Sequence, residues 1–383
     1  MNHHPANMLL DAALDEIVHP ATQFSHDWMH ALLVSGVFQH VLYLVLKAIK
    51  NHGIADIYQM LEQYVAMWTL EKRFGTSTAL ANMFAKKRET ADEKAKMFKC
   101  QASDALSVYS IIAFYLVNVI MPAGIAIAEC STFLALANLL DLFTSSHTGA
   151  VTPTQLAEAA EAFLDMCVVA GWKQHMVPKF HWLVHFKSNL RKWGMLLSCF
   201  VHERKHRMVK RYSTDIQNTR RCEWSTLSEV TCHHIADLAD ERKFDFTPHL
   251  LQPVRKAPAK MKAFLDANVG SPYGSEWFTS NAARLSQNEC CQRLDVVLVK
   301  SMNAAAVYAG QIWFIAEVDD VRMALVSLWE PIAAGSHTSC RRWRFSEANA
   351  SIVDLADVVC ACAWKRDGDF VQTLVPYLYR GFA

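Results

Sequence analysis

Apolar residues in the first two-thirds of the chain recur at intervals of three and four positions. This spacing places them on one face of an α-helix and predicts a mainly helical region over residues 1–245. The predicted helices cover residues 28–50, 57–74, 105–120, 125–143 and 155–170. Thr152-Pro153-Thr154 precedes the last of them and is typical of a helix start. The charged stretch 86–99 is predicted to be a solvated helix face or a loop.

The pattern changes after about residue 246. Proline and glycine interrupt residues 246–289, which predicts a linker with a short helix near residues 261–267. Short apolar runs of strand length then follow, beginning with LDVVLVK, QIWFIAEV, RMALVSLWE and CRRWRFSE, and the tail supplies two more. Asp319-Asp320 between two of these runs predicts a hairpin turn. We therefore expect a mainly α chain with a small antiparallel β-module, a barrel or a sandwich, over residues 290–383.

One stretch is long and apolar enough to suggest a membrane span. Residues 105–128 carry no charged side chain, and this length meets the requirement of a spanning helix. However, Met121-Pro122-Ala123-Gly124 interrupts the stretch, and proline with glycine is typical of a junction between two helices. No basic flank sets an orientation in a membrane. We therefore expect two buried helices and no membrane partner.

The composition indicates a globular intracellular protein. Of the 383 residues, 52% are hydrophobic and 20% are charged. The eleven cysteines are an odd number and include no C-x-x-C pair, which favours reduced thiols over a disulfide framework or a zinc ribbon. The first residues lack the basic and then apolar pattern of a signal peptide.

Positive charge is concentrated between residues 179 and 221. This segment holds eleven lysines and arginines against two acids, in a chain whose net charge is only +1. Such a cluster is typical of a surface that binds a polyanion, although it also occurs on solvated helix faces. Trp182, Trp193 and Tyr212 lie within the segment and could stack on bases, or belong to the core. We favour nucleic acid as the partner.

The same segment contains the pattern H-E-x-x-H at residues 202–206. On a helix the two histidines could bind one Zn²⁺ while Glu203 polarises a bound water, as in a zinc protease. Arg204 and Lys205 occupy the two free positions and would raise the local positive potential. No downstream acid stands out as a third ligand, and a four-histidine site with His181 and His185 is the other zinc hypothesis. We therefore do not expect zinc.

A second motif lies near the N-terminus, where residues 25–36 read SHDWMHALLVSG. Asp27 and His30 are three positions apart, so on a helix they project from one face. An acid and an imidazole in this arrangement can share a metal ion or orient each other. The alternative is that Asp27 caps the helix.

Taken with a downstream block, this element resembles the acid-x-x-His signature of cut-and-paste DNA transposases with a DDE catalytic triad, in particular the CACTA-like group. In that family a Pro-Lys-x-His helix is followed by a glycine turn and then by a Phe-Glu-Arg helix with a lysine one or two turns later. The corresponding residues here are PKFHWLVH at 178–185, Trp193-Gly194, VHER at 201–204, and Lys210. The resemblance covers residues 24–36 and 176–218.

The resemblance implies a remnant of a ribonuclease-H-like core, interrupted by an all-helical insertion over about residues 37–175 and ended by a terminal catalytic block over 176–218. The family chemistry is hydrolysis and strand transfer with two Mg²⁺ ions held by carboxylates. By this match Asp27 and Glu203 are the second and third carboxylates and the metal ligands, with Asp15 as an alternative to Asp27. His30 would support the site. The expected DNA contacts are Arg204, Lys205, Arg207, Lys210 and Arg211.

The chain also departs from the family pattern. The family's first aspartate lies on a strand before the acid-x-x-His element, whereas the 26 residues before Asp27 have the pattern of a helix and a loop. His202 replaces the usual aromatic residue before Glu203, and Met195 follows Gly194 where proline is common. A core without its central strands cannot position two metal ions, so we expect an incomplete chain that is inactive alone.

The sequence therefore predicts a transposase-derived, DNA-binding protein of the nucleus, with Mg²⁺ as the family cofactor and a homo-oligomer as a compatible assembly. One alternative is an active Mg²⁺-dependent nuclease or integrase, completed by a further N-terminal segment or by a partner. Another is a helical interaction scaffold. A zinc metalloprotease ranks below these three.

Overall fold

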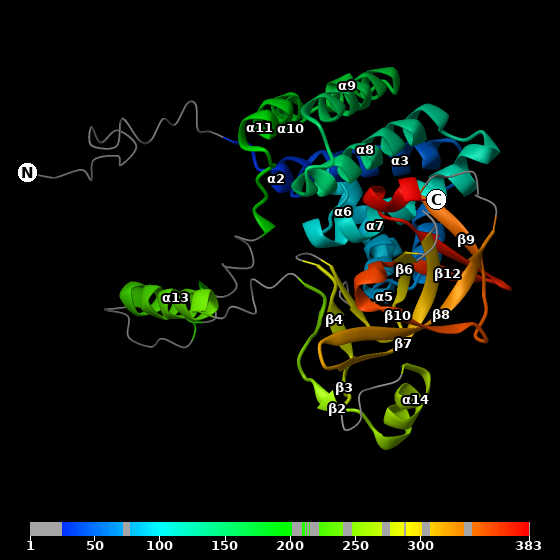
Figure 1. Ribbon diagram of the computed structural model, residues 1–383. Helices are drawn as coiled ribbons and strands as arrows, with labels where there is room; N and C mark the ends of the chain where they lie inside the picture. Colours follow the sequence, from blue (N-terminus) through cyan, green and yellow to red (C-terminus); the bar gives the residue numbers. More distant parts are fainter. Residues whose placement is uncertain are drawn as a thin grey trace, which may run out of the picture.

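The computed structural model of the chain describes residues 25–71, 77–200, 209–210, 212, 214, 222–239, 247–269, 276–286, 289–300, 307–332 and 339–382. Helices make up the described chain as far as residue 239, and antiparallel strands dominate from residue 249 onward (Figure 1). The predicted mainly α chain with a C-terminal all-β region is confirmed.

The helical region consists of α-helices joined by short turns of other helix types. The α-helices are α2 (Trp28–Leu32), α3 (Val37–Asn51), α4 (Ile57–Ala66), α5 (Ser77–Ala81), α6 (Lys86–Ala95), α7 (Ala102–Tyr115), α8 (Ile127–Ser145), α9 (Pro153–Val169), α10 (Pro178–Trp182), α11 (Phe186–Trp193) and α13 (Cys222–Ala239). The turns are η4 (Asn82–Phe84), η5 (Leu116–Ile120), η6 (Met121–Ala123), η7 (Ser146–Thr148), η8 (Lys173–His175) and η9 (Leu183–His185).

The helix predicted over residues 28–50 is broken into α2 and α3. Ser35 has a positive φ of 44°, and Gly36 lies so close to α2 that a Cβ atom there would be 2.5 Å from the carbonyl oxygen of Ala31. Only glycine can bring its backbone so close to α2, and the spacing of apolar residues gives no sign of this close contact. The helix predicted over 57–74 ends early, because Thr69 forms two backbone hydrogen bonds with Trp364 of the β-module, at 2.7 and 2.9 Å.

The helix junction predicted near residues 121–124 is present. The helix α7 continues as a π-helical turn, η5, and then as a 3₁₀ turn, η6, before Gly124 adopts a φ of +74° and α8 begins. Three helical stretches are long and apolar enough to cross a membrane: Trp28–Asn51, Ala102–Ala123 and Ile127–Thr148. Between 50% and 72% of their most apolar windows is buried inside the protein.

Two further predictions concern helix starts and charged stretches. Thr152 caps α9 by accepting a hydrogen bond from the Gln155 backbone, and the Gln155 side chain accepts one from the Thr152 backbone in return. This capping box satisfies two amides of the first turn, so the predicted helix start is confirmed. The charged stretch after residue 85 forms α6, whose side chains are mostly exposed except for the buried Asp92.

Among its described residues, the β-region contains two sheets and one α-helix, α14 (Ala259–Val269). Its strands are β1 (His249–Leu250), β2 (Arg255–Lys256), β3 (Phe278–Ser280), β4 (Ala282–Arg284), β5 (Cys290–Gln292), β6 (Val296–Lys300), β7 (Val307–Val318), β8 (Val321–Pro331), β9 (Cys340–Arg344), β10 (Ala350–Asp354), β11 (Val358–Cys362), β12 (Trp364–Asp367) and β13 (Phe370–Leu374). The smaller sheet has the order β1-β4-β5, and the larger follows β11-β6-β7-β8-β9-β13-β12, with β10 on β8 and β3 between β2 and β7.

Asp319 and Asp320 form the predicted hairpin turn between β7 and β8, and both have positive φ. The stretch 246–289, which we expected to be a linker, contributes strands to both sheets. For example, Phe278 of β3 pairs with Glu317 of β7. The described part of this stretch therefore belongs to the sheets of the β-region rather than forming a linker.

The helical core extends into the β-module. Cys340 of β9 and Leu374 of β13 are buried in the same apolar cluster as the helices α3, α7 and α8. The C-terminal turn η12 (Tyr377–Phe382) lies against α8, so the chain end returns to the helical region (Figure 1). The two parts are joined by a continuous core.

Candidate functional site

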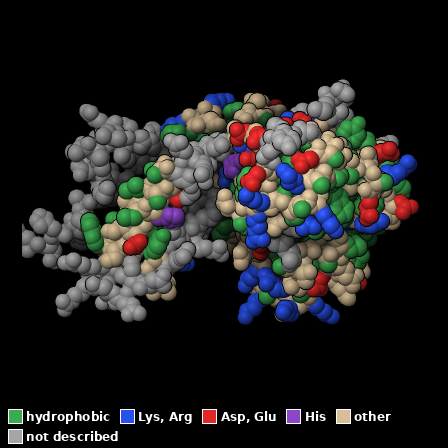
Figure 2. Space-filling view, turned by 60° about the horizontal axis from the view of Figure 1, so that its bottom comes forward, with side chains coloured by type: hydrophobic (Ala, Val, Ile, Leu, Met, Phe, Trp, Pro, Cys, Tyr) green, Lys and Arg blue, Asp and Glu red, His purple; other side chains and the backbone are tan. Residues whose placement is uncertain are grey.

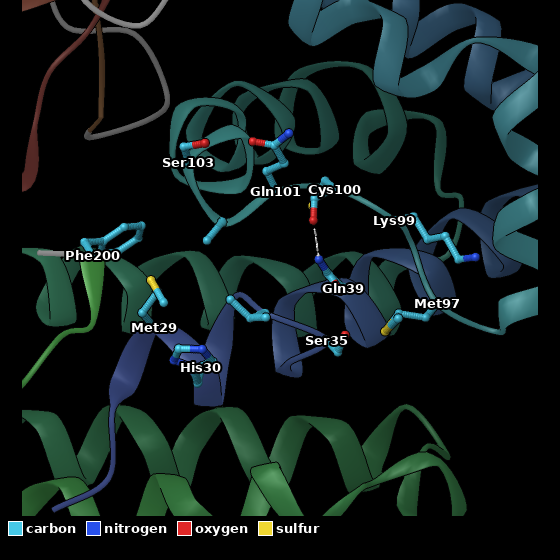
Figure 3. A pocket seen from close by; sticks show the side chains of 12 residues that line it. Met29, His30, Ser35, Gln39, Met97, Lys99, Cys100, Gln101, Ser103 and Phe200 are labelled. Atoms are coloured by element: carbon cyan, nitrogen blue, oxygen red, sulfur yellow. Dashed lines mark hydrogen bonds between the residues drawn. The ribbon is translucent and has the colours of Figure 1, made fainter. Parts of the chain in front are cut away.

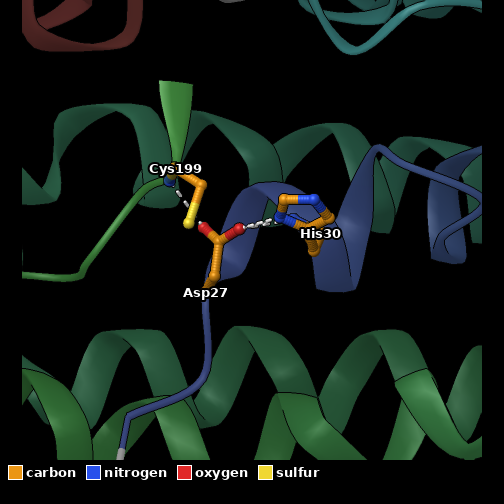
Figure 4. Close-up of side chains that lie close together, drawn as sticks. All are labelled: Asp27, His30 and Cys199. Atoms are coloured by element: carbon orange, nitrogen blue, oxygen red, sulfur yellow. Dashed lines mark hydrogen bonds and ion pairs between the residues drawn. The ribbon is translucent and has the colours of Figure 1, made fainter. Parts of the chain in front are cut away.

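The candidate site is built around Asp27, which caps α2. Its Oδ1 accepts hydrogen bonds from the backbone amides of Met29, at 3.1 Å, and of Cys199, at 2.9 Å. Its Oδ2 accepts one from the His30 amide at 3.2 Å and is in close contact with His30 Nδ1 (Figure 4). Helix capping and acid–imidazole pairing, which the sequence presented as alternatives, are therefore both present.

The pKa of Asp27 results from two opposing effects. Burial would raise it, but the hydrogen bonds from His30, Cys199 and Met29 outweigh burial and hold the pKa below its ordinary value. Asp27 is therefore ionised at neutral pH. Its carboxylate is a fixed negative charge at the start of a helix, where the helix dipole also favours an anion.

Residues 178–200 pack against α2, although about 150 positions separate them from it in the sequence. Lys179 donates hydrogen bonds to the carbonyl oxygens of His30, at 2.8 Å, and of Val34, at 2.6 Å. The Trp28 amide donates to Leu197 O at 3.3 Å. Lys179 thus satisfies carbonyls at the end of α2, and burial lowers its pKa.

Three histidines lie beside this junction. The Nε2 atoms of His181 and His185 are 3.1 Å apart, and the His26 ring stacks against His185 with its centroid 5.4 Å away. Burial, followed by the neighbouring His185 and His181, lowers the pKa of His26. The neutral form of His26 is therefore favoured, because its positive charge would be poorly hydrated here.

A cavity of about 850 Å³ opens beside His30 (Figure 3). It lies between the α2–α3 segment and the loop before α7, and Phe200 closes one end. Its polar lining includes Gln39, whose Nε2 donates to Cys100 O at 2.6 Å. The other polar side chains are those of His30, Ser35, Lys99, Gln101 and Ser103.

Asp27, His30 and Cys199 are the described residues that could together hold a metal ion, since their ligand atoms lie within 4.8 Å of one another. One carboxylate, one imidazole and one thiol do not suit Mg²⁺, which prefers an octahedron of oxygen ligands. This cluster therefore does not indicate Mg²⁺, and the expected magnesium site also depends on Glu203, which lies outside the described residues. The same carboxylate is already engaged by hydrogen bonds to His30 and to the Cys199 amide.

The structure brings some of the predicted site residues together and does not describe others. Asp27 and His30 are paired, as the spacing predicted. Glu203, the expected third carboxylate, lies outside the described residues, as do Arg204, Lys205, Arg207, Arg211 and the alternative acid Asp15. Lys210 is described and exposed.

Sequence reasoning missed two residues of this site. Cys199 contributes its amide to Asp27, and Lys179, which the sequence presented as a positive charge and as part of the Pro-Lys-x-His element, points inward to backbone carbonyls. No local pattern identifies either role, since both depend on the packing of residues 178–200 against α2. His26 directly precedes Asp27, and its neighbours His181 and His185 form a four-residue spacing that could have suggested the cluster.

Comparisons with protein-family models, with curated proteins and with solved structures find no match in any of the three.

Proposed function

We propose that this chain is a DNA-binding protein derived from a DDE transposase. In this proposal α2 and the block from α10 to Phe200 are parts of a ribonuclease-H-like core, and the helices between them are its all-helical insertion. DNA is bound by the basic segment over residues 179–221, in the nucleus.

One observation carries the proposal: the two sequence elements that resemble the transposase motifs contact each other. The contacts are specific, because Asp27 accepts from the Cys199 amide and Lys179 donates to the end of α2. Trp28 and Phe200 also pack edge to face, with their ring centroids 5.7 Å apart. Glu203 follows Phe200 by three residues in the sequence. Elements that evolved to form one site are expected to meet in this way.

The character of the intervening chain also supports the proposal. All described secondary structure from α3 to α9 is helical, apart from the bridge between Thr69 and Trp364, as an all-helical insertion requires. A helical interaction scaffold would share this feature. The acid–imidazole pair with a packed Pro-Lys helix is the feature that favours the transposase origin.

We propose that DNA contacts only the basic segment and not the rest of the protein surface. On the face shown in Figure 2, Lys and Arg side chains are interspersed with Asp and Glu. Within the basic segment Arg191, Lys192 and Lys210 are exposed. Because such contacts release counterions from DNA, binding should weaken steeply as salt increases.

The test is DNA binding by the full chain, measured by fluorescence anisotropy on a labelled duplex between about 50 and 200 mM salt. We expect binding with little sequence preference. The double variant Lys210→Ala with Arg211→Ala should weaken it about tenfold at low salt and reduce the steepness of the log–log salt dependence by roughly 2 units.

The matched control is Lys86→Ala with Lys87→Ala, which removes two exposed, adjacent lysines from α6 and should leave DNA binding unchanged. Equal losses in both double variants would mean that net charge alone matters and would contradict the assigned segment. Absence of binding at low salt would favour the interaction scaffold. Cleavage with Mg²⁺ that is lost in Glu203→Gln would instead favour the nuclease alternative.

A further inference from the structure

The ammonium group of Lys365 lies among three aromatic rings at the junction of the β-module and the helices. Its Nζ is 4.6 Å from the ring centroid of Tyr64, 5.4 Å from that of Trp68 and 5.8 Å from that of Phe114. It also donates a long hydrogen bond of 3.4 Å to Tyr64 Oη. Lys365 belongs to β12, whereas Tyr64 lies on α4, Phe114 lies on α7, and Trp68 is the second residue after the end of α4. We call these three side chains the aromatic box.

The box is rigid and largely shielded from solvent. Trp68 packs edge to face on Phe114 at 5.8 Å and on Tyr64 at 6.4 Å, so each ring supports the next. All three side chains are buried. The rings are therefore packed against one another in the helical core.

No salt bridge joins Lys365 to any carboxylate among the described residues. Burial lowers the pKa of Lys365, because the charged form loses hydration, and the nearby charge of Asp367 opposes this effect only in part. The ring faces carry partial negative charge and attract a cation, and this attraction opposes the loss of hydration. Aromatic rings gathered around an ammonium group that makes no salt bridge are typical of sites for alkylammonium ligands.

We propose that the aromatic box is an alkylammonium-binding site and that Lys365 is its internal ligand, which latches the β-module onto the helical region. The latch is next to the bridge between Thr69 and Trp364. The two backbone hydrogen bonds of this bridge join the helical region to the β-module as an antiparallel pair. Lys365 follows Trp364 directly, so the backbone bridge positions the ammonium group and the box binds it. This inference is independent of the proposed DNA binding.

The test is hydrogen exchange by mass spectrometry on the full chain. Lys365→Met keeps an apolar stem of similar length and removes the charge. We expect exchange to rise about tenfold in residues 57–71 and 364–374, with no change in β6 and β7, because the cation attraction is lost only at the junction. Lys365→Arg keeps a cation and should exchange at nearly the wild-type rate. Exchange in Lys365→Met that equals that of the wild type overturns the proposal.

The matched control is Arg366→Ala. Arg366 is the next residue of β12, and its guanidinium lies 4.1 Å from the ring centroid of Phe345 within the β-module. Removing it deletes a cation–ring contact of the same kind that does not join the two parts. Exchange in residues 57–71 should therefore stay at the wild-type rate, and an equal rise in both variants would contradict a latch at Lys365.

Two ligand experiments separate the cation from the apolar stem. In Lys365→Ala, added propylammonium should restore slow exchange, whereas 1-propanol, its neutral analogue of the same size, should not. In the wild-type protein, tetramethylammonium chloride should compete for the box and speed exchange in residues 57–71 relative to equal sodium chloride. Equal rescue by both additives, or no difference between the two salts, would show that the box does not select cations.

Discussion

Asp27 illustrates how one residue can serve both the local structure and a distant segment. Its place before an apolar helix and its spacing from His30 predicted the cap and the acid–imidazole pair, because both depend on neighbours within one turn. The hydrogen bond from the Cys199 amide depends on packing over a separation of 172 positions, and no local pattern contains it. The sequence therefore identified the site residue but not the group that fixes it.

Replacing Asp27 with Asn should destabilise the protein. The amide can accept fewer of the hydrogen bonds from Met29, His30 and Cys199, so we expect a loss of about 1 kcal/mol in the free energy of unfolding, measured with urea at neutral pH. The control is Asp165→Asn on the exposed face of α9, which should change little.

The effect of Asp27→Asn should also depend on pH. Because the folded state lowers the pKa of Asp27 below its ordinary 3.8, the unfolded state binds more protons between the two values, and stability rises with pH there. The contribution of Asp27 is fully present above its ordinary pKa and is lost as the pH falls through the folded one. The difference between wild type and variant should therefore shrink in acid, and a difference that grows would contradict the assignment.

At the scale of elements, the sequence predicted helices and strands better than their ends. Spacing identified the long helices α3, α4, α7, α8 and α9, and turn-forming residues identified the β7–β8 hairpin and the start of α9. It did not identify α5 or α13. It missed the break before α3, because a close approach between backbones at Gly36 leaves no periodic signal. It also missed β1 to β4, since strands of two or three residues are too short to show alternation.

Thr152→Ala should weaken α9. The substitution removes the oxygen that accepts from the Gln155 amide, at 3.2 Å, and so leaves a first-turn donor without its cap. We expect a loss of about 1 kcal/mol, measured as the change in the free energy of unfolding in urea. Thr154→Ala, two residues on and equally exposed, lies inside the first turn and is the matched control, expected to be neutral or slightly stabilising. Equal losses in both variants would exclude capping as the cause.

At the scale of the whole molecule, the β-module is fixed to the helices by polar contacts as well as by the shared core. Arg380 Nη1 donates to Asp141 Oδ2 at 2.6 Å, and Tyr109 Oη donates to Asp141 Oδ1 at 2.7 Å. Burial and the neighbouring Asp141 raise the pKa of Tyr109 well above its ordinary value, so it remains a donor. The sequence predicted the two parts but not their docking, because Arg380 and Asp141 lie 239 residues apart.

Arg380→Ala should be strongly destabilising. It leaves the carboxylate of Asp141, whose side chain is only 7% exposed, without its cation, which typically costs about 3–5 kcal/mol. The control is Arg344→Ala, since Arg344 pairs with Glu330 on the surface, where both side chains are more than 60% exposed, and this should cost less than about 1 kcal/mol. Thermal unfolding of both variants gives the comparison. Arg380→Ala with the stability of the wild type would show that the contact does not hold the β-module in place.

The return of the chain end to the helices has a consequence for biosynthesis. Arg380 is translated 239 residues after Asp141, and Lys365 is translated 301 residues after Tyr64. While the nascent chain is still on the ribosome, the helices have neither partner, and the surface that later receives β12 and η12 stays uncovered. Such a surface is prone to aggregate, so chains that stop before the last strands should depend on chaperones to remain soluble.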